Sequence, residues 1–426
     1  MQFCKSSEKK FPEFFAALRG RGGELADGVE MTVKKIIGEV KAEGDTALKR
    51  YTKQFDGHEN IVVSADTITG SCKRISPELM KSLELAFARI EDYHRRQMQQ
   101  SWFTTEKSGA VTGQVIRPLE RIGVYVPGGK ALYPSSVLMN VVPAIVAGVN
   151  EIIMVTPGSP SGIDPVILAA AELCGITKIF QIGGAQAVAA LAYGTGIVPR
   201  VDKIVGPGNI YVAVAKKQVF GDVDIDMIAG PSEILIISDG SGEPAWAAAD
   251  MLSQAEHDEM ASSVLVTTDE AFGKLVMDEI NLQIEQLPRK AIARSSIDNY
   301  GSVIVADSLE EAVRLSNDIA PEHLELYVED PWKLLPFINN AGAIFMGHLT
   351  PEPLGDYAAG PNHVLPTGGT ARFFSPLSVD DYVKKMSLLC FNDAGLNQIG
   401  TDVVRLARSE QLEAHARSVE IRTLKK

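Results

Sequence analysis

The chain has 426 residues, which is long enough for two or three domains, and 45% of them are hydrophobic, as in a globular protein. Its formal net charge of −13 at pH 7 disfavours binding to nucleic acid or to anionic lipid, because like charges repel. The polar N-terminus, an apolar run at 137–149 that is too short to span a bilayer, and four cysteines without a Cys-x-x-Cys pair predict a cytoplasmic protein without disulfides.

Helical periodicity dominates the first hundred residues. Apolar side chains between residues 33 and 40 recur at helical spacing, and Asp45 is placed to cap a second helix. Ser76 and Pro77 supply an N-cap and a first-turn proline for a third helix. His94 continues the apolar face of that helix, so we expect it to be a boundary histidine and not a ligand.

The pattern changes at about residue 122, where apolar runs of strand length begin to alternate with alanine-rich helical segments. This alternation predicts parallel, doubly wound α/β layers, and the runs are too numerous for one compact sheet. The residues after about Val379 return to a helical pattern. The predicted fold is therefore α/β, with two parallel-sheet domains, a helical N-terminal segment and a helical C-terminal arm. Strands are predicted at 122–126, 152–155, 179–182, 203–205, 234–238, 264–267, 303–305, 324–328 and 343–346, and helices at 165–174, 185–193, 209–219, 244–257 and 309–319.

Three glycine-rich turns follow predicted strands, at 125–130, 183–186 and 206–209. A glycine turn below a helix N-terminus allows an anion to approach closely, and open α/β sheets bind ligands at the carboxyl ends of their strands. No Gly-x-Gly-x-x-Gly motif follows a strand, so the usual dinucleotide fingerprint is absent. Each turn taken alone is more typical of an ordinary connection.

Two pairs of polar side chains lie on predicted helices. Gln254 and His257 are three residues apart, so they share one helix face, and each can donate a lone pair to a metal ion. Such a pair is more often a surface or capping feature, because glutamine is an uncommon ligand. Glu410 and His415 lie five residues apart in the last helical segment and face different sides, and Glu410 alone is typical of an exposed helix residue.

Acid and imidazole side chains also occur together in two predicted loops. Glu322 and His323 are adjacent just before a strand, where two proton-transfer groups can serve one pocket, although such neighbours are more often plain solvated residues. A loop at 355–363, rich in glycine, carries Asp356 and His363. These two loops are candidates for catalytic or ligand-binding segments.

Taken together, these segments resemble the histidinol dehydrogenase family over nearly the whole chain. The match begins in the strand and turn at 122–129 and ends at Ala414 and His415, and the segments occur in the family's order. Any one segment is weak evidence, whereas all of them in register are a specific signal. Further segments that carry the resemblance are Gly206-Pro207-Gly208-Asn209, Ala229-Gly230-Pro231-Ser232-Glu233, Gln254-Ala255-Glu256-His257, Ala320-Pro321-Glu322-His323, Gly355-Asp356-Tyr357 and His363-Val364-Leu365-Pro366-Thr367.

The resemblance implies a zinc-dependent, NAD-linked enzyme of histidine biosynthesis that oxidises L-histidinol to L-histidine in the cytoplasm. It implies one Zn²⁺ per subunit, which grips and orients the substrate through oxygen and nitrogen donors without thiolate. Glu322 and His323 match the catalytic pair, and His363 lies near the substrate without an assigned role. The implied zinc ligands are Gln254, His257, Asp356 and His415, the implied substrate contacts are Ser232, Gln254, His257, His323, Asp356, Glu410 and His415, and the implied NAD contacts are Tyr125, Gln186 and Asn209.

The family reaction removes four electrons in two hydride transfers to two NAD molecules. The resemblance implies that His323 accepts the alcohol proton in the first oxidation and acts again in the second. Glu322 deprotonates the water that attacks the aldehyde between the two steps. The aldehyde would react with lysines or water if released, so the site must retain it.

The family fold implies two Rossmann-like α/β domains and a C-terminal helical arm that crosses to the partner chain of a homodimer. Glu410 and His415 would then act in trans. We expect one domain from 1–125 and 238–375, a second, nucleotide-facing domain from 126–237, and the arm from 376–426.

Three other functions are compatible with parts of this pattern. The first is a member of the same family that oxidises another amino or sulfonated alcohol, against which Asp356 and the Glu410/His415 pair argue. The second is a catalytically inactive NAD-binding protein, against which the intact Glu322–His323 pair argues. The third is a zinc hydrolase, and an assay of NADH formation from histidinol separates all of them.

Overall fold

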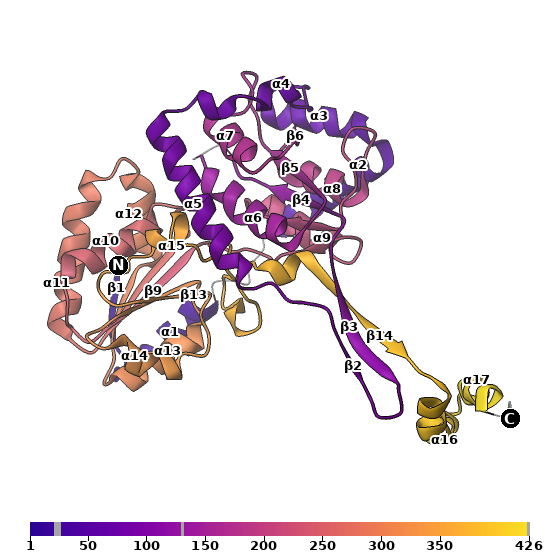
Figure 1. Ribbon diagram of the computed structural model, residues 1–426. Coiled ribbons are helices and arrows are strands. Elements are labelled where there is room, and N and C mark those ends of the chain that lie inside the picture. The colour runs from indigo at the N-terminus through magenta and orange to yellow at the C-terminus, as the bar shows by residue number, and fades with distance from the viewer. Residues whose placement is uncertain (21–26, 129–131, 424–426) are drawn as a thin grey trace.

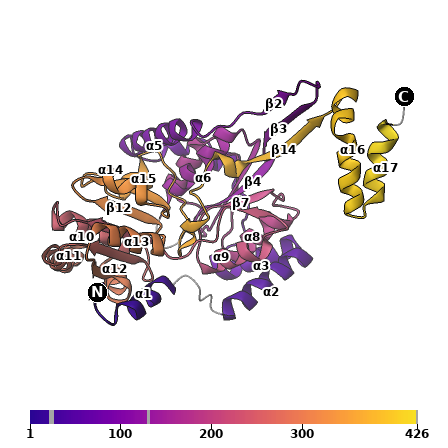
Figure 2. The same ribbon diagram turned by 90° about the horizontal axis from the view of Figure 1, so that it is seen from below.

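The computed structural model consists of two α/β units and a long arm that projects from them (Figures 1 and 2). It describes residues 1–20, 27–128 and 132–423. Gly129 and Lys130 of the first glycine-rich turn lie outside these ranges. The predicted α/β fold with two parallel sheets and a helical C-terminal end is confirmed.

The first unit is built on a six-stranded, wholly parallel sheet with the order β1-β11-β10-β9-β12-β13. Helices cover both faces, and each face buries its own apolar cluster, so the central strands are apolar on both sides. The strands are β1 (Gln2–Lys5), β9 (Glu233–Ser238), β10 (Ser262–Thr267), β11 (Ser302–Val305), β12 (His323–Tyr327) and β13 (Ala343–Met346), and the helices are α1 (Phe11–Arg19), α10 (Pro244–Ala255), α11 (Glu270–Gln283), α12 (Lys290–Tyr300), α13 (Leu309–Ile319), α14 (Pro331–Leu334) and α15 (Pro353–Tyr357).

The second unit is built on a five-stranded parallel sheet with the order β6-β5-β4-β7-β8. Its apolar clusters also lie on both faces, with α2, α3, α8 and α9 on one side and α4 to α7 on the other. The strands are β4 (Arg121–Tyr125), β5 (Glu151–Thr156), β6 (Lys178–Gln181), β7 (Lys203–Val205) and β8 (Asp224–Ile225), and the helices are α2 (Asp27–Glu43), α3 (Asp45–Asp56), α4 (Ala65–Ile68), α5 (Pro77–Arg95), α6 (Pro134–Ala147), α7 (Pro165–Leu173), α8 (Gly184–Tyr193) and α9 (Ile210–Val219).

The arm is more than the helical tail that the sequence predicts. A three-stranded antiparallel sheet, β14-β3-β2, forms its shaft, and two helices form its tip (Figure 1). The prediction that all residues after about Val379 are helical is therefore wrong for residues 383–390, which pair as a strand with β3. The elements of the arm are β2 (Trp102–Thr105), β3 (Val111–Pro118), β14 (Val383–Cys390), α16 (Asp393–Ser409) and α17 (Glu413–Thr423).

Sheet membership divides the chain differently from the expected segments. Among the described residues before 126, β1 and α1 pack with the six-stranded sheet, whereas the elements from α2 to β4, apart from the hairpin of the arm, pack with the five-stranded sheet. The strand at residues 233–238 joins the six-stranded sheet. Helices α2, α3 and α5 belong to the second unit, because α2 and α3 pack against α8 and α5 packs against α6.

Helix ends agree with the sequence in part. Ser76 caps α5 by accepting the N–H of Leu79, as predicted. Asp45 does not cap α3, since Gly44 holds the N-cap position. The Asp45 carboxylate instead accepts the N–H of Ile197 at 3.0 Å and ties α3 to the loop after α8. Short 3₁₀ turns complete the chain at Ser71–Lys73, Ile284–Gln286, Leu335–Phe337, Thr370–Arg372 and Val379–Tyr382.

Candidate active site and metal centre

A buried group of acids and imidazoles lies at the amino ends of β9 and β12. His323 is the first residue of β12, and Glu322 directly precedes it. The turn before them is tight, because Ala320 closes α13 with a left-handed backbone (φ 54°), which a residue with a Cβ adopts only at a cost. A Cβ on Gly342 would lie 2.5 Å from the Glu322 carbonyl, so a glycine is required where the next strand passes.

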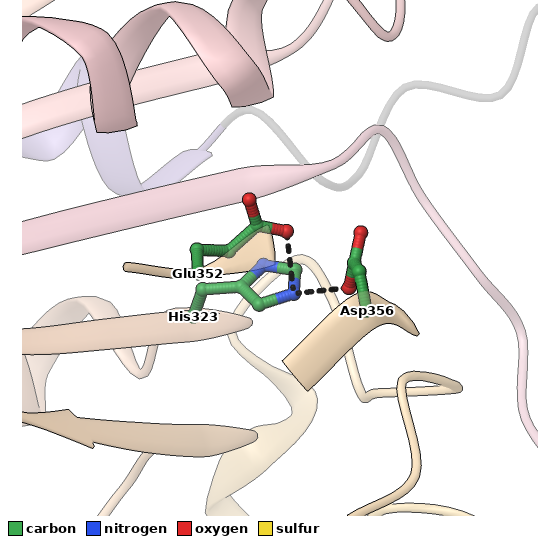
Figure 3. A group of neighbouring side chains, drawn as sticks. All are labelled: His323, Glu352 and Asp356. Carbon is green, nitrogen blue, oxygen red and sulfur yellow. Dashed lines mark ion pairs between the residues drawn. The ribbon is translucent and has the colours of Figure 1, made fainter. Parts of the chain in front are cut away.

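His323 is held in one tautomer. Its Nδ1 lies 2.9 Å from the backbone carbonyl of Glu233, so this nitrogen carries the proton and donates it. In the neutral ring Nε2 carries the lone pair, and among the described residues this buried atom has no hydrogen-bond partner. Glu352 Oε1 lies 3.6 Å and Asp356 Oδ1 lies 3.8 Å from Nε2 (Figure 3). Two carboxylates therefore face this nitrogen and favour its protonated form unless their charge is offset.

The charges of this cluster shift the pKa values of its members. Burial alone would lower the pKa of His323, but Glu322, Asp356 and Glu352 outweigh it and raise the pKa to about 10. Burial raises the pKa of Glu322 to about 8, although His323 and the N–H of Glu233, 2.9 Å away, oppose the shift. Burial, together with Asp356, raises the pKa of Glu352 to about 8. Burial would raise the pKa of Asp356 as well, but His323 and His363 lower it, so Asp356 carries the charge.

Three side chains of the cluster could hold a cation together. One ligand atom from each of His323, Glu352 and Asp356 lies within 4.8 Å of the other two. Glu352 is not among the residues that the sequence analysis selects, although it contacts this centre. The sequence contained a signal for Glu352. This residue lies between Pro351 and Pro353, four residues before Asp356, and at that spacing two residues share one face of a helix.

Gln254 lies near the end of α10, and His257, which follows the helix, lies near the same centre. Gln254 is fully buried, and both atoms of its amide lack a hydrogen-bond partner among the described residues. An amide left in this way is costly unless something outside the chain satisfies it. Burial lowers the pKa of His257, and the neighbouring Asp356 opposes the shift, which places the imidazole near that carboxylate. The surface or capping role that the sequence left open for the pair therefore does not apply to Gln254.

His363 completes the group from the loop after α15. Its Nδ1 lies 3.9 Å from Asp356 Oδ1, and burial lowers its pKa. Ser232 lies on the segment that enters β9, where its carbonyl accepts the N–H of Ser262 at 2.9 Å. The loop residues predicted as a functional segment thus reach the cluster around His323.

The residues matched to NAD contacts gather at the carboxyl ends of the five-stranded sheet. Tyr125 ends β4, and its hydroxyl accepts the N–H of Gly184 at 3.0 Å, which joins two of the glycine-rich turns. Gln186 is buried in the first turn of α8, and neither atom of its amide has a partner among the described residues. Asn209 caps α9 by accepting the N–H groups of Tyr211 and Val212, so the structure also gives it a structural role. The acid and imidazole cluster therefore lies at the amino ends of the strands in the six-stranded sheet, whereas the residues matched to NAD contacts lie at the carboxyl ends of the strands in the five-stranded sheet.

Glu410 and His415 do not join the cluster within one chain. Glu410 ends α16 and His415 lies in α17, and both side chains are exposed. Figures 1 and 2 show these helices at the far end of the arm, well away from β12 and α15 of the same chain.

Comparison with known proteins agrees with this geometry. The family model described as histidinol dehydrogenase matches residues 20–423. A relative named histidinol dehydrogenase from Geobacter sulfurreducens is 58% identical, with 99% of this chain and 100% of the relative covered. A histidinol dehydrogenase from Syntrophotalea carbinolica is 57% identical, with 99% of each chain covered. The crystal structure of histidinol dehydrogenase from Elizabethkingia anophelis superposes with a TM-score of 0.94 at 38% identity, covering 99% of this chain and 98% of that one.

The chain belongs to the histidinol dehydrogenase family. The resemblance drawn from the sequence is therefore confirmed, and with it the class of enzyme, an NAD-dependent oxidoreductase of histidine biosynthesis. Outside histidinol dehydrogenase, an acetylating aldehyde dehydrogenase from Geobacillus thermoglucosidasius shares the fold, with a TM-score of 0.50 at 13% identity, covering 89% of this chain and 97% of that one. Across the described ranges, no helix has the length and apolarity needed to cross a membrane.

Proposed function

We propose that this protein oxidises L-histidinol to L-histidine through bound L-histidinal, using two NAD molecules and one water. The observation that carries the proposal is the buried Glu322–His323 pair, in which the free Nε2 of His323 and a carboxylate offer two bases in one pocket. Four free cysteines, as in a reducing compartment, support a cytoplasmic location.

The residues at the centre fit a bound zinc ion. Gln254 offers an unpartnered buried amide, Asp356 carries a charge, and His257 is neutral because burial lowers its pKa. We propose these three as ligands, with the partner subunit's His415 as the fourth. Bound there, Zn²⁺ would grip the amine and imidazole nitrogens of histidinol and offset the carboxylate charge that raises the pKa of His323. Ser232 and the partner subunit's Glu410 are the remaining substrate contacts that we propose.

His323 acts as the base in both oxidations. Its Nδ1–H is committed to the Glu233 carbonyl, so Nε2 is the atom that accepts the alcohol proton as hydride leaves the carbon. The aldehyde that forms must then gain an oxygen atom. Once it is hydrated, the same Nε2 accepts a proton from the hydrate as the second hydride leaves. His323 must release the first proton between the two steps, and the carboxylates around it provide neighbours for that transfer.

Glu322 activates the water that converts aldehyde to hydrate. A carboxylate whose pKa is raised to about 8 by burial is a stronger base than a solvated one. The N–H of Glu233 donates to Glu322 Oε2 and fixes its position beside His323. Two bases at fixed positions are needed, because the alcohol proton and the water proton leave from different places.

The hydride acceptor is proposed to bind at the carboxyl ends of the five-stranded sheet, against Tyr125, Gln186 and Asn209. The buried, unpartnered amide of Gln186 supports this placement, since a ligand hydrogen bond would satisfy it. NAD bound there would supply the hydride acceptor for a substrate held at the other unit.

The arm is proposed to complete the site of a second copy in a homodimer. Its helices carry exposed Leu406, Leu412 and Ile421, and its shaft carries exposed Trp102 and Leu389. Apolar side chains on a projecting element are typical of a surface that another chain covers. Glu410 and His415 then act in trans, at the partner's Gln254, His257 and Asp356.

The stoichiometry of NADH tests the proposed reaction directly. We expect two NADH per histidinol consumed and no aldehyde that a solution trap can capture, because the intermediate stays bound until its second oxidation. Absorbance at the NADH band, with histidine measured in parallel, gives the ratio. A ratio of one, with trappable aldehyde, would show that the chain performs the alcohol step alone.

Zinc content tests the ligand set. Asp356→Asn keeps the shape of a ligand but removes its charge, so zinc affinity should fall by more than the ~10–100-fold typical of outer-shell losses. Gln254→Leu should also release zinc, whereas Glu352→Gln, a neighbour of the same centre, should retain it. Elemental analysis of the purified variants gives the metal per chain. Loss of zinc from the Glu352 and Asp356 variants, with zinc retained by the Gln254 variant, would assign the metal to the His323–Glu352–Asp356 group instead.

A further inference from the structure

Helix α6 contains a proline that leaves one backbone carbonyl without its helical hydrogen bond, and a residue from another part of the chain donates to that carbonyl. Pro143 lies inside the helix and has no N–H, so the carbonyl of Met139, four residues earlier, lacks its helical donor. Asn362 donates its Nδ2–H to that carbonyl at 2.7 Å. Asn362 is 4% exposed, so this bond is shielded from water. The side chain thus occupies the one acceptor that the proline leaves open.

Every polar atom of the Asn362 side chain is used. Its second Nδ2 proton points at His94 Nε2, 3.3 Å away, and its Oδ1 accepts the N–H of Val364 at 2.9 Å. His94 Nδ1 lies 2.7 Å from the Ile90 carbonyl, so Nδ1 carries the proton and Nε2 is the acceptor. His94 is fully buried in α5 and is not the boundary residue that the sequence predicts, although it is not placed at the metal centre either.

These contacts join two units of the fold at the catalytic loop. Helices α5 and α6 pack with the five-stranded sheet, whereas Asp356 belongs to α15 beside β12 of the six-stranded sheet. Arg89 of α5 adds two bonds, from Nε to the Ala358 carbonyl at 2.6 Å and from its other nitrogen to the Ala359 carbonyl at 3.3 Å. The loop at 358–363 is therefore fixed to the nucleotide-facing unit. Asp356 lies two residues before this loop, and His363 is its last residue.

We propose that Asn362 is a positioning residue for hydride transfer, which sets His363 and Asp356 relative to the nucleotide unit through the carbonyl that Pro143 leaves free. The inference rests on the proposed function, since it concerns the alignment of substrate with NAD. Hydride passes between molecules held by different units, so a small displacement of the loop separates the reacting atoms. A misplacement of about 1 Å typically lowers turnover by about 100-fold.

If Asn362 only stabilised the fold, restoring the lost hydrogen bond of α6 should restore activity as well as stability. Replacing Pro143 in the Asn362 variant tests this. In Asn362→Ala, the Met139 carbonyl loses its donor, which costs stability. In the double variant Pro143→Ala/Asn362→Ala, the new N–H at 143 satisfies that carbonyl within the helix. The double variant therefore restores the buried bond of α6 but not the tie between α6 and the loop.

The experiment compares kcat, KM and Tm of these variants as zinc-loaded enzymes. We expect Asn362→Ala to lower kcat by about 100-fold, with KM for NAD within about two-fold of the parent value, and to lower Tm by about 2–6 °C. We expect the double variant to regain most of the lost Tm while kcat stays low. Adding Asn362→Ala to His363→Ala should slow turnover by less than Asn362→Ala slows the parent, because part of its effect acts through His363.

The matched control is Gln283→Ala. Gln283 donates from Nε2 to the Ala245 carbonyl at 2.9 Å, so it also ties two segments of the chain. Ala245 lies at the start of α10, after the carboxyl end of β9, whereas the cluster lies at the amino ends of the strands. This control variant should have a lower Tm than the parent and the same kcat. Recovery of both Tm and kcat in the double variant, or an unchanged kcat in Asn362→Ala, would overturn the proposal. A parent enzyme that forms no NADH from histidinol would instead reject the proposed function itself.

Discussion

Replacing Glu322 with glutamine is expected to leave the oxidation of histidinol to histidinal largely intact and to slow the oxidation of histidinal by about 10²–10⁴-fold. Glutamine keeps the shape and the hydrogen bond from the Glu233 N–H, but it cannot take a proton from water. His323→Asn should slow both oxidations to a similar degree, because the same Nε2 serves each step. Single-turnover measurements that start from histidinol and, separately, from histidinal resolve the two rates.

A second buried carboxyl provides the control for the Glu322 variant. Glu325, which lies in β12 three residues after Glu322, is 3% exposed and accepts the Glu352 N–H at 3.0 Å, but it is not one of the proposed bases. Glu325→Gln should change the rates of histidinol oxidation and histidinal oxidation only slightly, and both to the same degree. If Glu322→Gln slowed the alcohol step as much as the aldehyde step, the division of labour between the two bases would be wrong.

Mixed dimers of two inactive variants are expected to recover about a quarter of the parent activity. One chain carries His323→Ala and the other His415→Ala, and each homodimer lacks one essential group at every site. When equal amounts are unfolded and refolded together, about half of the dimers are mixed, and each mixed dimer has one intact site under two-fold pairing. The other site of that dimer lacks both groups.

Pairs of variants from the same region serve as controls for this exchange. His323→Ala mixed with Asp356→Ala should stay inactive, because both changes lie in the body of the chain. His415→Ala mixed with a Glu410 variant should also fail to complement. If mixed dimers isolated by two different tags showed no activity, the arm would complete the site of its own chain and not that of the partner.

Nine of the eleven described strands in the two parallel sheets were predictable because they are buried, and the short strands β1 and β8 were missed. In parallel sheets covered by helices, strands are continuous apolar runs, and the nine predicted strands coincide with β4 to β7 and β9 to β13 within a residue or two. The arm strands were missed for the opposite reason. Trp102 and Phe103 in β2 and Leu389 in β14 are more than half exposed, so no buried face imposes an alternating pattern on these segments.

The site was predictable where side chains are adjacent in the chain and not where packing brings them together. The Glu322–His323 pair and the Gln254/His257 spacing are visible in the sequence, and resemblance gave them their roles. Glu352 was missed, because its spacing of four residues from Asp356 is a weak signal without the burial beside His323 that only the structure shows. Asn362 was missed too, since its partner is a carbonyl left open by a proline more than two hundred positions away.

The pairing of β1 with β11 has a consequence for the order in which the protein is made. Gln2 lies beside Ser302 and Lys5 beside Val305, so the first strand to leave the ribosome finds its neighbour only after most of the chain has been synthesised. The five-stranded sheet with α2 to α9 is nearly continuous in sequence, from Asp27 to Ile225, and can form while the rest is still being translated. The N-terminal segment must therefore stay unpaired through that period. We therefore expect the nucleotide-facing unit to form before the sheet that carries His323, because the latter needs β11 to pair with β1.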